Sequence, residues 1–328
     1  MYNLNQICDV HLEITSKCQA RCPMCPRRIQ GGPINPNFEL NEISLETFKK
    51  WFPIEFITQL RSLFMCGGLG DPIIAADTLE IFQYIRSINS KIILTMHTNG
   101  SARNKQWWID LAKTQVNITF GIDGLEDTHA LYRVDTNYNQ ILKNAKTFID
   151  AGGKAFWKFL AFKHNEHQIE ECRHTSKELG FEEFNVLHTG RYLNKQYQSL
   201  NIDGTPAHIL YPTDTSLKII KLIEAGAKFP VSSITCKAKA GNQIYVAADG
   251  KVTPCCWLNV SWKNPESPNR RNFEDQIGEH PNLHNNSLQE IFDSGYFKKI
   301  ESTWVNKPLV ECSQQCGNVD KARIEWQE

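Results

Sequence analysis

We expect an α/β fold built on a parallel sheet, because three features of the sequence agree. Six short apolar runs alternate with helix-like stretches from residue 8 to about residue 190. Polar or glycine-containing loops bound each run, and a cysteine-rich loop follows the first. Parallel strands joined by crossover helices form an open sheet or a full or partial barrel, and chemistry gathers at their carboxyl ends.

The expected strands are short, apolar and separated by helical stretches. They are CDVHLEI (8–14), SLFMC (62–66), KIILTMH (91–97), VNITFGI (116–122), FWKFLAF (156–162) and FNVLH (184–188).

The expected helices lie between these strands, and several begin with Ser, Asp or Asn at the position that caps a helix. They cover residues 44–60, 77–88, 104–113, 138–152 and 167–180.

The character of the chain changes after residue 190. A polar, turn-rich stretch leads to one helical segment at 216–226, and GNQIYVAADGKVTPCCW predicts a β-hairpin with its turn at Asp249 and Gly250. Residues 264–286 resemble a loop, and 287–304 form an amphipathic helical pattern. We therefore expect three parts, which are a core domain (1–190), a linker with a bridging helix (191–230) and a small cysteine-bearing domain (231–328).

Composition limits the possible partners and the compartment. The 328-residue chain has 36 basic and 36 acidic residues, a balance that indicates neither nucleic acid nor a membrane as a partner. It shows no secretory signal and no apolar run of about 18 residues, so we expect a cytoplasmic protein. In a reducing compartment its eleven cysteines are expected to be metal ligands where they cluster.

Three cysteines with the spacing CxxxCxxC form the first cluster: Cys18, Cys22 and Cys25. Zinc sites and iron–sulfur clusters normally take four protein ligands, but no further Cys or His follows until Cys66. The fourth ligand is then either a distant residue or a cofactor. The loop also has basic residues that we expect to lower the pKa of the thiols: Lys17, Arg21, Arg27 and Arg28.

This motif after an N-terminal strand resembles the signature of the radical S-adenosylmethionine (radical SAM) superfamily. The resemblance implies a partial (β/α)6 TIM-like barrel in which the three cysteines hold a 4Fe-4S cluster. S-adenosylmethionine (AdoMet) would bind the fourth iron, and its reductive cleavage would give a 5'-deoxyadenosyl radical that abstracts a hydrogen atom from the substrate.

Three further segments resemble the cofactor-binding parts of this family. FMCGGLGDP (64–72) resembles the glycine-rich segment, in which we expect Gly67, Gly68 and Gly70 to approach the ligand closely and to adopt positive φ. A tight strand-to-helix turn is the alternative role for these glycines. Asp71 stands where the family usually has Glu, which leaves its contribution open.

The segments HTNG (97–100) and FGIDGLEDTHALYR (120–133) complete this resemblance. They add candidate cofactor-binding residues, which are Thr98, Asn99, Asp123 and Arg133. Gly121 replaces the usual serine, so a hydroxyl contact to the cofactor must come from elsewhere, for example from Thr98 or Thr119. Asp123 is also suited to a turn, and Arg133 either binds the cofactor carboxylate or forms an ordinary salt bridge.

The C-terminal cysteines form a second constellation, in which Cys236, Gly250 and Cys255 precede the pair CSQQC. This spacing resembles the Twitch module, the shorter relative of SPASM. The resemblance implies one auxiliary 4Fe-4S cluster that is fully ligated by Cys236, Cys255, Cys312 and Cys316. Cys256 is an alternative to Cys255, and a structural zinc ion is an alternative to the cluster.

The resemblance implies an oxidoreductase-type radical SAM enzyme that modifies a peptide or small-molecule substrate. A closed auxiliary cluster suggests one-electron oxidation of a substrate radical, giving dehydrogenation or cross-linking, with a flavodoxin- or ferredoxin-type electron donor. A radical epimerase with Cys66 as hydrogen donor is the alternative enzyme, and a non-enzymatic zinc-binding protein is the alternative outside this class.

Overall fold

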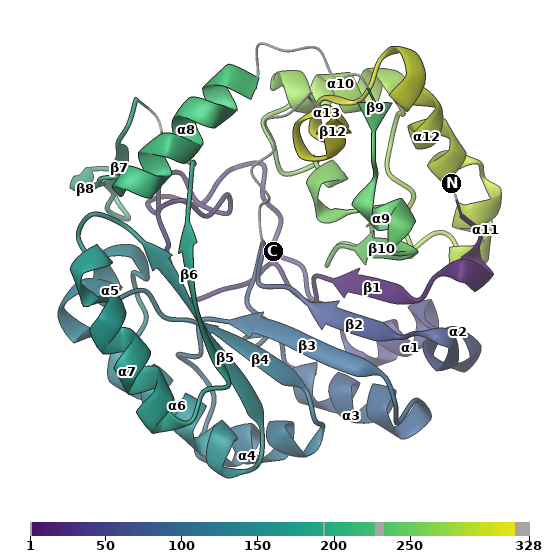
Figure 1. Cartoon of the computed structure of the whole chain (residues 1–328). Coiled ribbons are helices and arrows are strands. Elements are labelled where there is room, and N and C mark those ends of the chain that lie inside the picture. The colour runs from purple at the N-terminus through teal and green to yellow at the C-terminus, as the bar shows by residue number, and fades with distance from the viewer. Residues whose placement is uncertain (1, 193, 227–232, 319–328) are drawn as a thin grey trace.

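A curved, mostly parallel sheet forms the centre of the molecule (Figure 1). The structure, a computed structural model, describes residues 2–192, 194–226 and 233–318. Six strands pair in chain order and lie within two residues of the ranges expected from the sequence. They are β1 (Asp9–Leu12), β2 (Ser62–Met65), β3 (Ile93–Thr98), β4 (Asn117–Gly121), β5 (Lys154–Ala161) and β6 (Glu183–His188).

Helices follow the strands and cover the convex face of the sheet (Figure 1). They are α1 (Leu45–Trp51), α2 (Ile54–Gln59), α3 (Thr78–Ile88), α4 (Lys105–Lys113), α5 (Glu126–Tyr132), α6 (Tyr138–Asp150) and α7 (Ile169–Leu179). The helix expected at 44–60 is two helices, because Pro53 cannot continue α1 and instead caps α2. The short helix α5 was not expected.

The strands place different side chains on the two faces of the sheet, because successive residues alternate. Val10 and Leu12 are buried in the apolar core beneath the helices. His11 lies on the opposite, inner face, where its ring centroid is 4.9 Å from that of Phe64. Phe64 is in turn 4.7 Å from the ring of His97. Polar and aromatic groups of three strands therefore meet inside the curve of the sheet.

The C-terminal part of the chain extends the same sheet. The expected hairpin forms from β10 (Gln243–Val246) and β11 (Val252–Thr253), and Gly250 adopts a φ of +83° in its turn. β10 also pairs in parallel with β1, so that Asp9 lies opposite Gln243. The sheet consequently crosses the domain boundary expected at residue 231.

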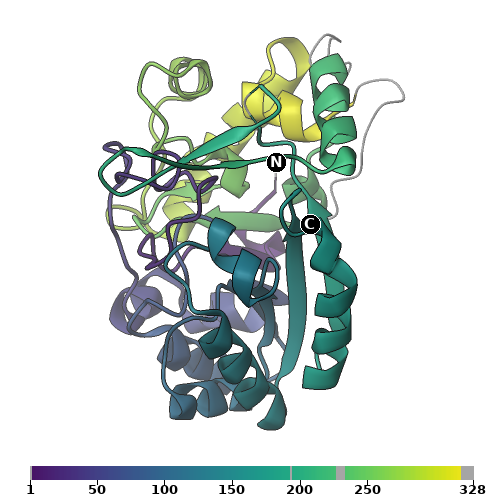
Figure 2. The same ribbon diagram turned by 90° about the vertical axis from the view of Figure 1, so that its left-hand side faces the viewer.

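The segment between the two cysteine regions contains a second hairpin that was not expected. It consists of β7 (Tyr197–Leu200) and β8 (Pro206–Leu210), and α8 (Asp214–Gly226) follows it, close to the expected helix at 216–226. Figure 2 shows the hairpin extending alongside the N-terminal loop. Tyr197 donates a hydrogen bond of 3.1 Å to the carbonyl of Pro23, so the hairpin packs against this loop.

The remaining C-terminal elements are short and lie over β1 and β10 (Figure 1). They are the strands β9 (Ser233–Ile234) and β12 (Gly317–Asn318), the helices α9 (Lys237–Ala240), α10 (Pro268–Gln276), α11 (Leu288–Asp293), α12 (Tyr296–Asn306) and α13 (Val310–Cys316), and the 3-10 turn η3 (Cys256–Leu258). Two further 3-10 turns lie outside this part: η1 (Leu4–Gln6) before β1 and η2 (Glu166–Gln168) before α7.

Two expectations for the C-terminal elements were wrong. Residues 264–286 were expected to be a loop but contain α10, in which Ser267 caps the helix, Pro268 occupies its first position and Phe273 is buried. The single helix expected at 287–304 is two helices, because Gly295 adopts a φ of +81° between them. No helix in the described part of the chain is long and apolar enough to span a membrane.

Candidate functional site

The three N-terminal cysteines lie on one loop beyond the carboxyl end of β1, as the α/β architecture predicts. A turn brings two of them together, since the backbone N–H of Cys25 donates a 3.0 Å hydrogen bond to the carbonyl of Cys22. Cys18, Cys22 and Cys25 are all partly exposed. The loop therefore presents three thiols on a fixed backbone.

Asp71 links this loop to the end of β3. Its buried carboxylate accepts 2.7 Å hydrogen bonds from the Thr98 hydroxyl and from the Asn99 backbone N–H, and its own N–H donates to the carbonyl of Lys17. The side-chain amide of Asn99 donates to the Cys18 sulfur at 3.7 Å. Burial raises the pKa of Asp71 to about 6 despite these bonds. Asp71 and Thr98 thus orient Asn99 toward the cysteine loop.

Arg133 approaches the loop from the other side. Its Nη1 atom lies 3.9 Å from the Cys22 sulfur, and its Nε donates a 2.6 Å hydrogen bond to the fully buried carboxylate of Asp123. Asp123 is fixed in turn by a 2.7 Å bond from the backbone N–H of Leu160. The two residues therefore form a partly buried ion pair beside Cys22, in which the Asp123 side chain is fully buried and that of Arg133 is 22% exposed.

The same ion pair explains why glycine occupies position 121. A Cβ atom on Gly121 would lie 2.5 Å from the Nη2 atom of Arg133, which is closer than real Cβ contacts. The guanidinium fills the space that a serine side chain would need. The glycine at position 121, where the family usually has serine, is therefore explained by the position of the Arg133 guanidinium.

The three glycines of FMCGGLGDP serve close packing and not unusual backbone conformation. None of Gly67, Gly68 and Gly70 adopts the positive φ that we expected. A Cβ atom on Gly70 would overlap the carbonyl oxygen of Thr15, and one on Gly68 would lie 2.6 Å from a carboxylate oxygen of Glu13. The small residues therefore let this segment lie directly against β1 and the cysteine loop.

The basic residues of the loop were expected to lower the thiol pKa, and Arg27 does so at Cys18, but burial has the larger effect at two cysteines. Burial raises the pKa of Cys22 to about 11 and also raises that of Cys18. Arg27 counteracts the shift at Cys18, and Arg133 counteracts it at Cys22. Arg21 is engaged elsewhere, with its Nε 2.5 Å from a carboxylate oxygen of Asp135.

The C-terminal cysteines lie around a single pocket between η3, α12 and α13. Its lining includes all four expected ligands, which are Cys236, Cys255, Cys312 and Cys316.

Backbone pairing brings the ends of this set together. β9 and β12 pair antiparallel, and the N–H of Thr235 donates a 3.0 Å hydrogen bond to the carbonyl of Cys316, which places Cys316 beside Cys236. Burial, and then the neighbouring thiols, raise the pKa of Cys255 and Cys312. Four sulfurs from distant parts of the chain thus share one buried space.

Cys256 has a different environment from Cys255. Among the described residues that line the C-terminal pocket, Cys255 is present and Cys256 is not. Cys256 lies near enough to Cys66 to raise the pKa of that thiol, after the larger effect of burial.

A second cavity, of about 340 Å³, lies between the end of β1 and the C-terminal elements. Phe38 and Trp262 form apolar parts of its lining, and Glu13, Lys251 and Arg270 provide charged groups. A space of this size accepts an amino-acid side chain or a small metabolite.

Two residues near the site were missed in the sequence. His11 and Glu13 lie inside the run CDVHLEI, at alternate positions of an otherwise apolar strand. Their spacing of two places them on one face, which was the available signal. Both side chains lie on the inner face, next to Cys66.

Comparison with known families identifies two regions of the chain. The radical SAM superfamily matches residues 12–178, and the SPASM iron–sulfur cluster-binding domain matches residues 236–317. No curated protein matches the sequence.

Solved structures with bound cofactor share the fold. Streptococcus suis SuiB bound to S-adenosylmethionine is 15% identical with a TM-score of 0.57, and the match covers 90% of this chain and 68% of SuiB. Native anSMEcpe with bound AdoMet is 14% identical with a TM-score of 0.58, covering 89% of this chain and 82% of that protein.

Proposed function

Because this chain belongs to the radical SAM superfamily, we propose that it is an enzyme that oxidises a peptide or small-metabolite substrate through abstraction of a hydrogen atom. The observation that supports this most is the pairing of a three-thiol loop with a separate four-thiol pocket. The structure of SuiB bound to its precursor peptide SuiA supports a peptide as the substrate.

The donor sets fit the groups that the two families imply, which are AdoMet with a 4Fe-4S cluster and an auxiliary iron–sulfur cluster. Three thiols leave one corner of a cluster for the cofactor, and we assign Cys18, Cys22 and Cys25 to it. Four thiols close the second cluster. We assign to it Cys236, Cys255, Cys312 and Cys316. When bound, the cofactor and its cluster supply the capacity to remove a hydrogen atom from an unactivated C–H bond.

The residues around the loop would position the cofactor. The Nε of Arg133 donates a hydrogen bond to Asp123, and its Nη1 points toward Cys22. We therefore propose that the guanidinium binds an anionic group such as the cofactor carboxylate. Asp71 and Thr98 act on Asn99, whose amide faces Cys18. Gly67, Gly68 and Gly70 keep the neighbouring segment close to β1.

The substrate would bind in the 340 Å³ cavity between the end of β1 and the C-terminal elements. Its apolar wall excludes water from a reacting carbon, and Lys251 and Arg270 provide donors for a carboxylate or a backbone carbonyl. The buried four-cysteine pocket suits an electron acceptor that does not bind substrate. We propose a flavodoxin- or ferredoxin-type protein as the external electron donor.

The proposal is tested with protein purified and reconstituted anaerobically. We expect about eight iron atoms per chain and formation of 5'-deoxyadenosine from AdoMet after reduction with dithionite. Cys22→Ala should abolish 5'-deoxyadenosine, whereas Cys172→Ala, which alters a buried cysteine on α7, should not. Colourless protein that binds zinc in place of iron would contradict the enzyme assignment.

The reaction type is tested by mass spectrometry of a peptide or metabolite substrate. Oxidation removes two hydrogen atoms and lowers the mass by about 2 Da. An epimerase would instead give a product whose mass is unchanged in H₂O and is about 1 Da higher in D₂O, because one deuterium is incorporated.

A further inference from the structure

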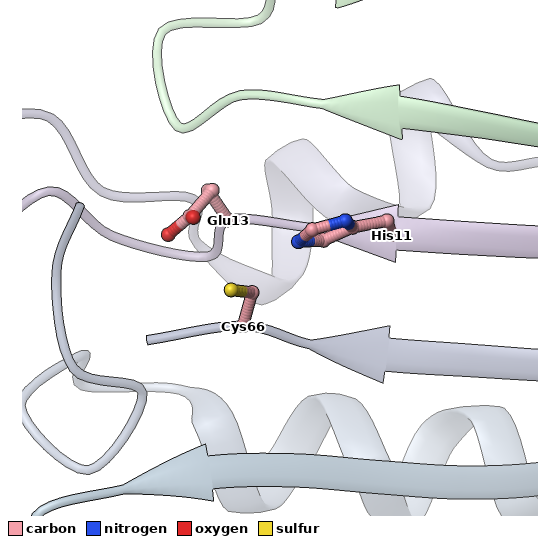
Figure 3. A group of neighbouring side chains, drawn as sticks. All are labelled: His11, Glu13 and Cys66. Carbon is pink, nitrogen blue, oxygen red and sulfur yellow. The ribbon is translucent and has the colours of Figure 1, made fainter. Parts of the chain in front are cut away.

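A group of three side chains that belong to neither cysteine set and could bind a metal ion lies on the inner face of the sheet. His11 belongs to β1, Glu13 follows β1 directly, and Cys66 follows β2 (Figure 3). One ligand atom from each side chain lies within 4.8 Å of the other two. The parallel pairing of β1 with β2 holds them together, since the N–H of Cys66 donates a 3.1 Å bond to the carbonyl of Leu12.

The ring of His11 is held by aromatic packing, and one of its nitrogens is buried. Its ring lies between Phe64 and Tyr245, with both ring centroids 4.9 Å away. Among the described residues, no group forms a hydrogen bond with its buried Nε2 atom. A buried imidazole nitrogen normally has a partner, because an unsatisfied buried polar atom costs about 1–3 kcal/mol.

Glu13 is held in place by the glycine-rich segment. It accepts a 3.3 Å hydrogen bond from the backbone N–H of Leu69, and Gly68 leaves room for its second oxygen. Burial raises the pKa of Glu13 to about 8 and lowers that of His11 to about 4.

We propose that His11, Glu13 and Cys66 bind one divalent cation of the zinc class. Imidazole nitrogen, carboxylate oxygen and thiolate sulfur are the three donors that zinc accepts, and three protein ligands leave a tetrahedral ion one open position. The ion replaces the protons of the carboxyl and thiol groups. It thereby places a positive charge beside the carboxylate and thiolate, and it gives the Nε2 atom of His11 a partner.

The site is reached from the 340 Å³ cavity, because Glu13 also lines that cavity. The open position would therefore take an oxygen or nitrogen donor from a molecule bound there, such as a carboxylate or an amine. This ion is distinct from both clusters, so its presence does not depend on the proposed reaction.

The test measures metal content in the full chain with both clusters reconstituted. After growth with added zinc and removal of loose metal with a weak chelator, we expect about one zinc per chain in addition to the iron. X-ray absorption at the zinc edge should show about one sulfur ligand, with nitrogen or oxygen as the others. Each of His11→Phe, Glu13→Gln and Cys66→Ser should lower the zinc content at least about tenfold and leave the iron content unchanged.

The controls separate loss of a ligand from loss of folding. His11→Phe keeps an aromatic ring between Phe64 and Tyr245, and unchanged iron content shows that the variant is folded. His97→Phe changes another histidine of the inner face and should leave zinc unchanged. Wild-type protein without zinc, equal zinc in all variants, or a zinc shell of four sulfurs would each overturn the proposal, the last because the ion would then occupy the cysteine pocket.

Discussion

The two cysteine regions differ in how the chain brings their thiols together. Cys18, Cys22 and Cys25 lie on one short, partly exposed loop, and residues from other strands contact it through side chains. The C-terminal pocket instead collects thiols from η3, α13 and the segment after β9. In the first region, neighbouring side chains orient the loop that carries the thiols. In the second region, the thiols themselves connect separate elements of the fold. Loss of a thiol should therefore impair chemistry at the first and the fold at the second.

The largest expected effect comes from removing one thiol in each region. Cys22→Ala and Cys312→Ala should each lower the iron content by about four atoms per chain. Cys22→Ala should reduce 5'-deoxyadenosine formation by about 1,000-fold or more and leave the thermal midpoint near that of the wild type. Cys312→Ala should lower the free energy of unfolding by about 2–4 kcal/mol, because a ligand of a metal that bridges separate elements is lost.

Thermal unfolding followed by circular dichroism, together with iron analysis, checks this comparison. Equal destabilisation by both substitutions would show that the two regions contribute to the fold in the same way.

A smaller effect is expected from Gly121→Ser, which sharpens the role of Arg133. The added side chain displaces the guanidinium from Cys22, so we expect about tenfold slower 5'-deoxyadenosine formation with an unchanged auxiliary cluster. The rate of 5'-deoxyadenosine formation is measured for Gly121→Ser, for Arg133→Ala and for the double variant, to test whether the guanidinium causes the effect. If the effect acts through the guanidinium, Gly121→Ser should add nothing to Arg133→Ala. Fully additive losses would contradict this explanation.

The last expected effect concerns the pH dependence of stability and the C-terminal elements alone. Burial lowers the pKa of His280 to about 4 from its ordinary 6.5, and its ring contacts Phe273 and accepts or donates a 3.1 Å bond with Tyr296. The unfolded chain binds a proton between these pH values and the folded chain does not, so the stability contribution is present above pH 6.5 and is lost as the pH falls toward 4.

His280→Phe keeps the ring contact and should remove about 2 kcal/mol of the difference in unfolding free energy between pH 4.5 and pH 7. Denaturant unfolding at the two pH values measures it. His174→Phe, at an exposed histidine of α7, is the matched control and should keep the wild-type dependence. An unchanged dependence in His280→Phe would contradict the prediction.

The sequence was sufficient for the parts of the fold that local patterns specify. The six parallel strands, most helices of the core and the hairpin at Gly250 follow from apolar periodicity, capping residues and turn residues. α10 was missed because its composition is polar, although Ser267 and Pro268 marked its start. The pairing of β10 with β1 was missed because no local signal specifies which distant strand completes a sheet edge.

The candidate site shows the same limit. Motif spacing identified the cysteines, but the roles of the surrounding residues depend on contacts between strands. The place of Asp71 and Asp123 near the cofactor stays a prediction, and the structure adds what motif spacing could not give, which is that their carboxylates accept hydrogen bonds from Thr98 and Arg133. Glu13 has no motif of its own, and contacts from a distant segment place it in the site, since Gly68 packs against its carboxylate and the backbone N–H of Leu69 donates to it.

The pairing of β1 with β10 has a consequence for biosynthesis. During translation one edge of β1 has no partner until Gln243 and the residues after it leave the ribosome. An unpaired strand edge in a nascent chain favours association with other chains, and such long-range pairing is slow. We therefore expect a lower expression level or a lower growth temperature to raise the yield of the native protein, because fewer incomplete chains are then present to associate through this edge.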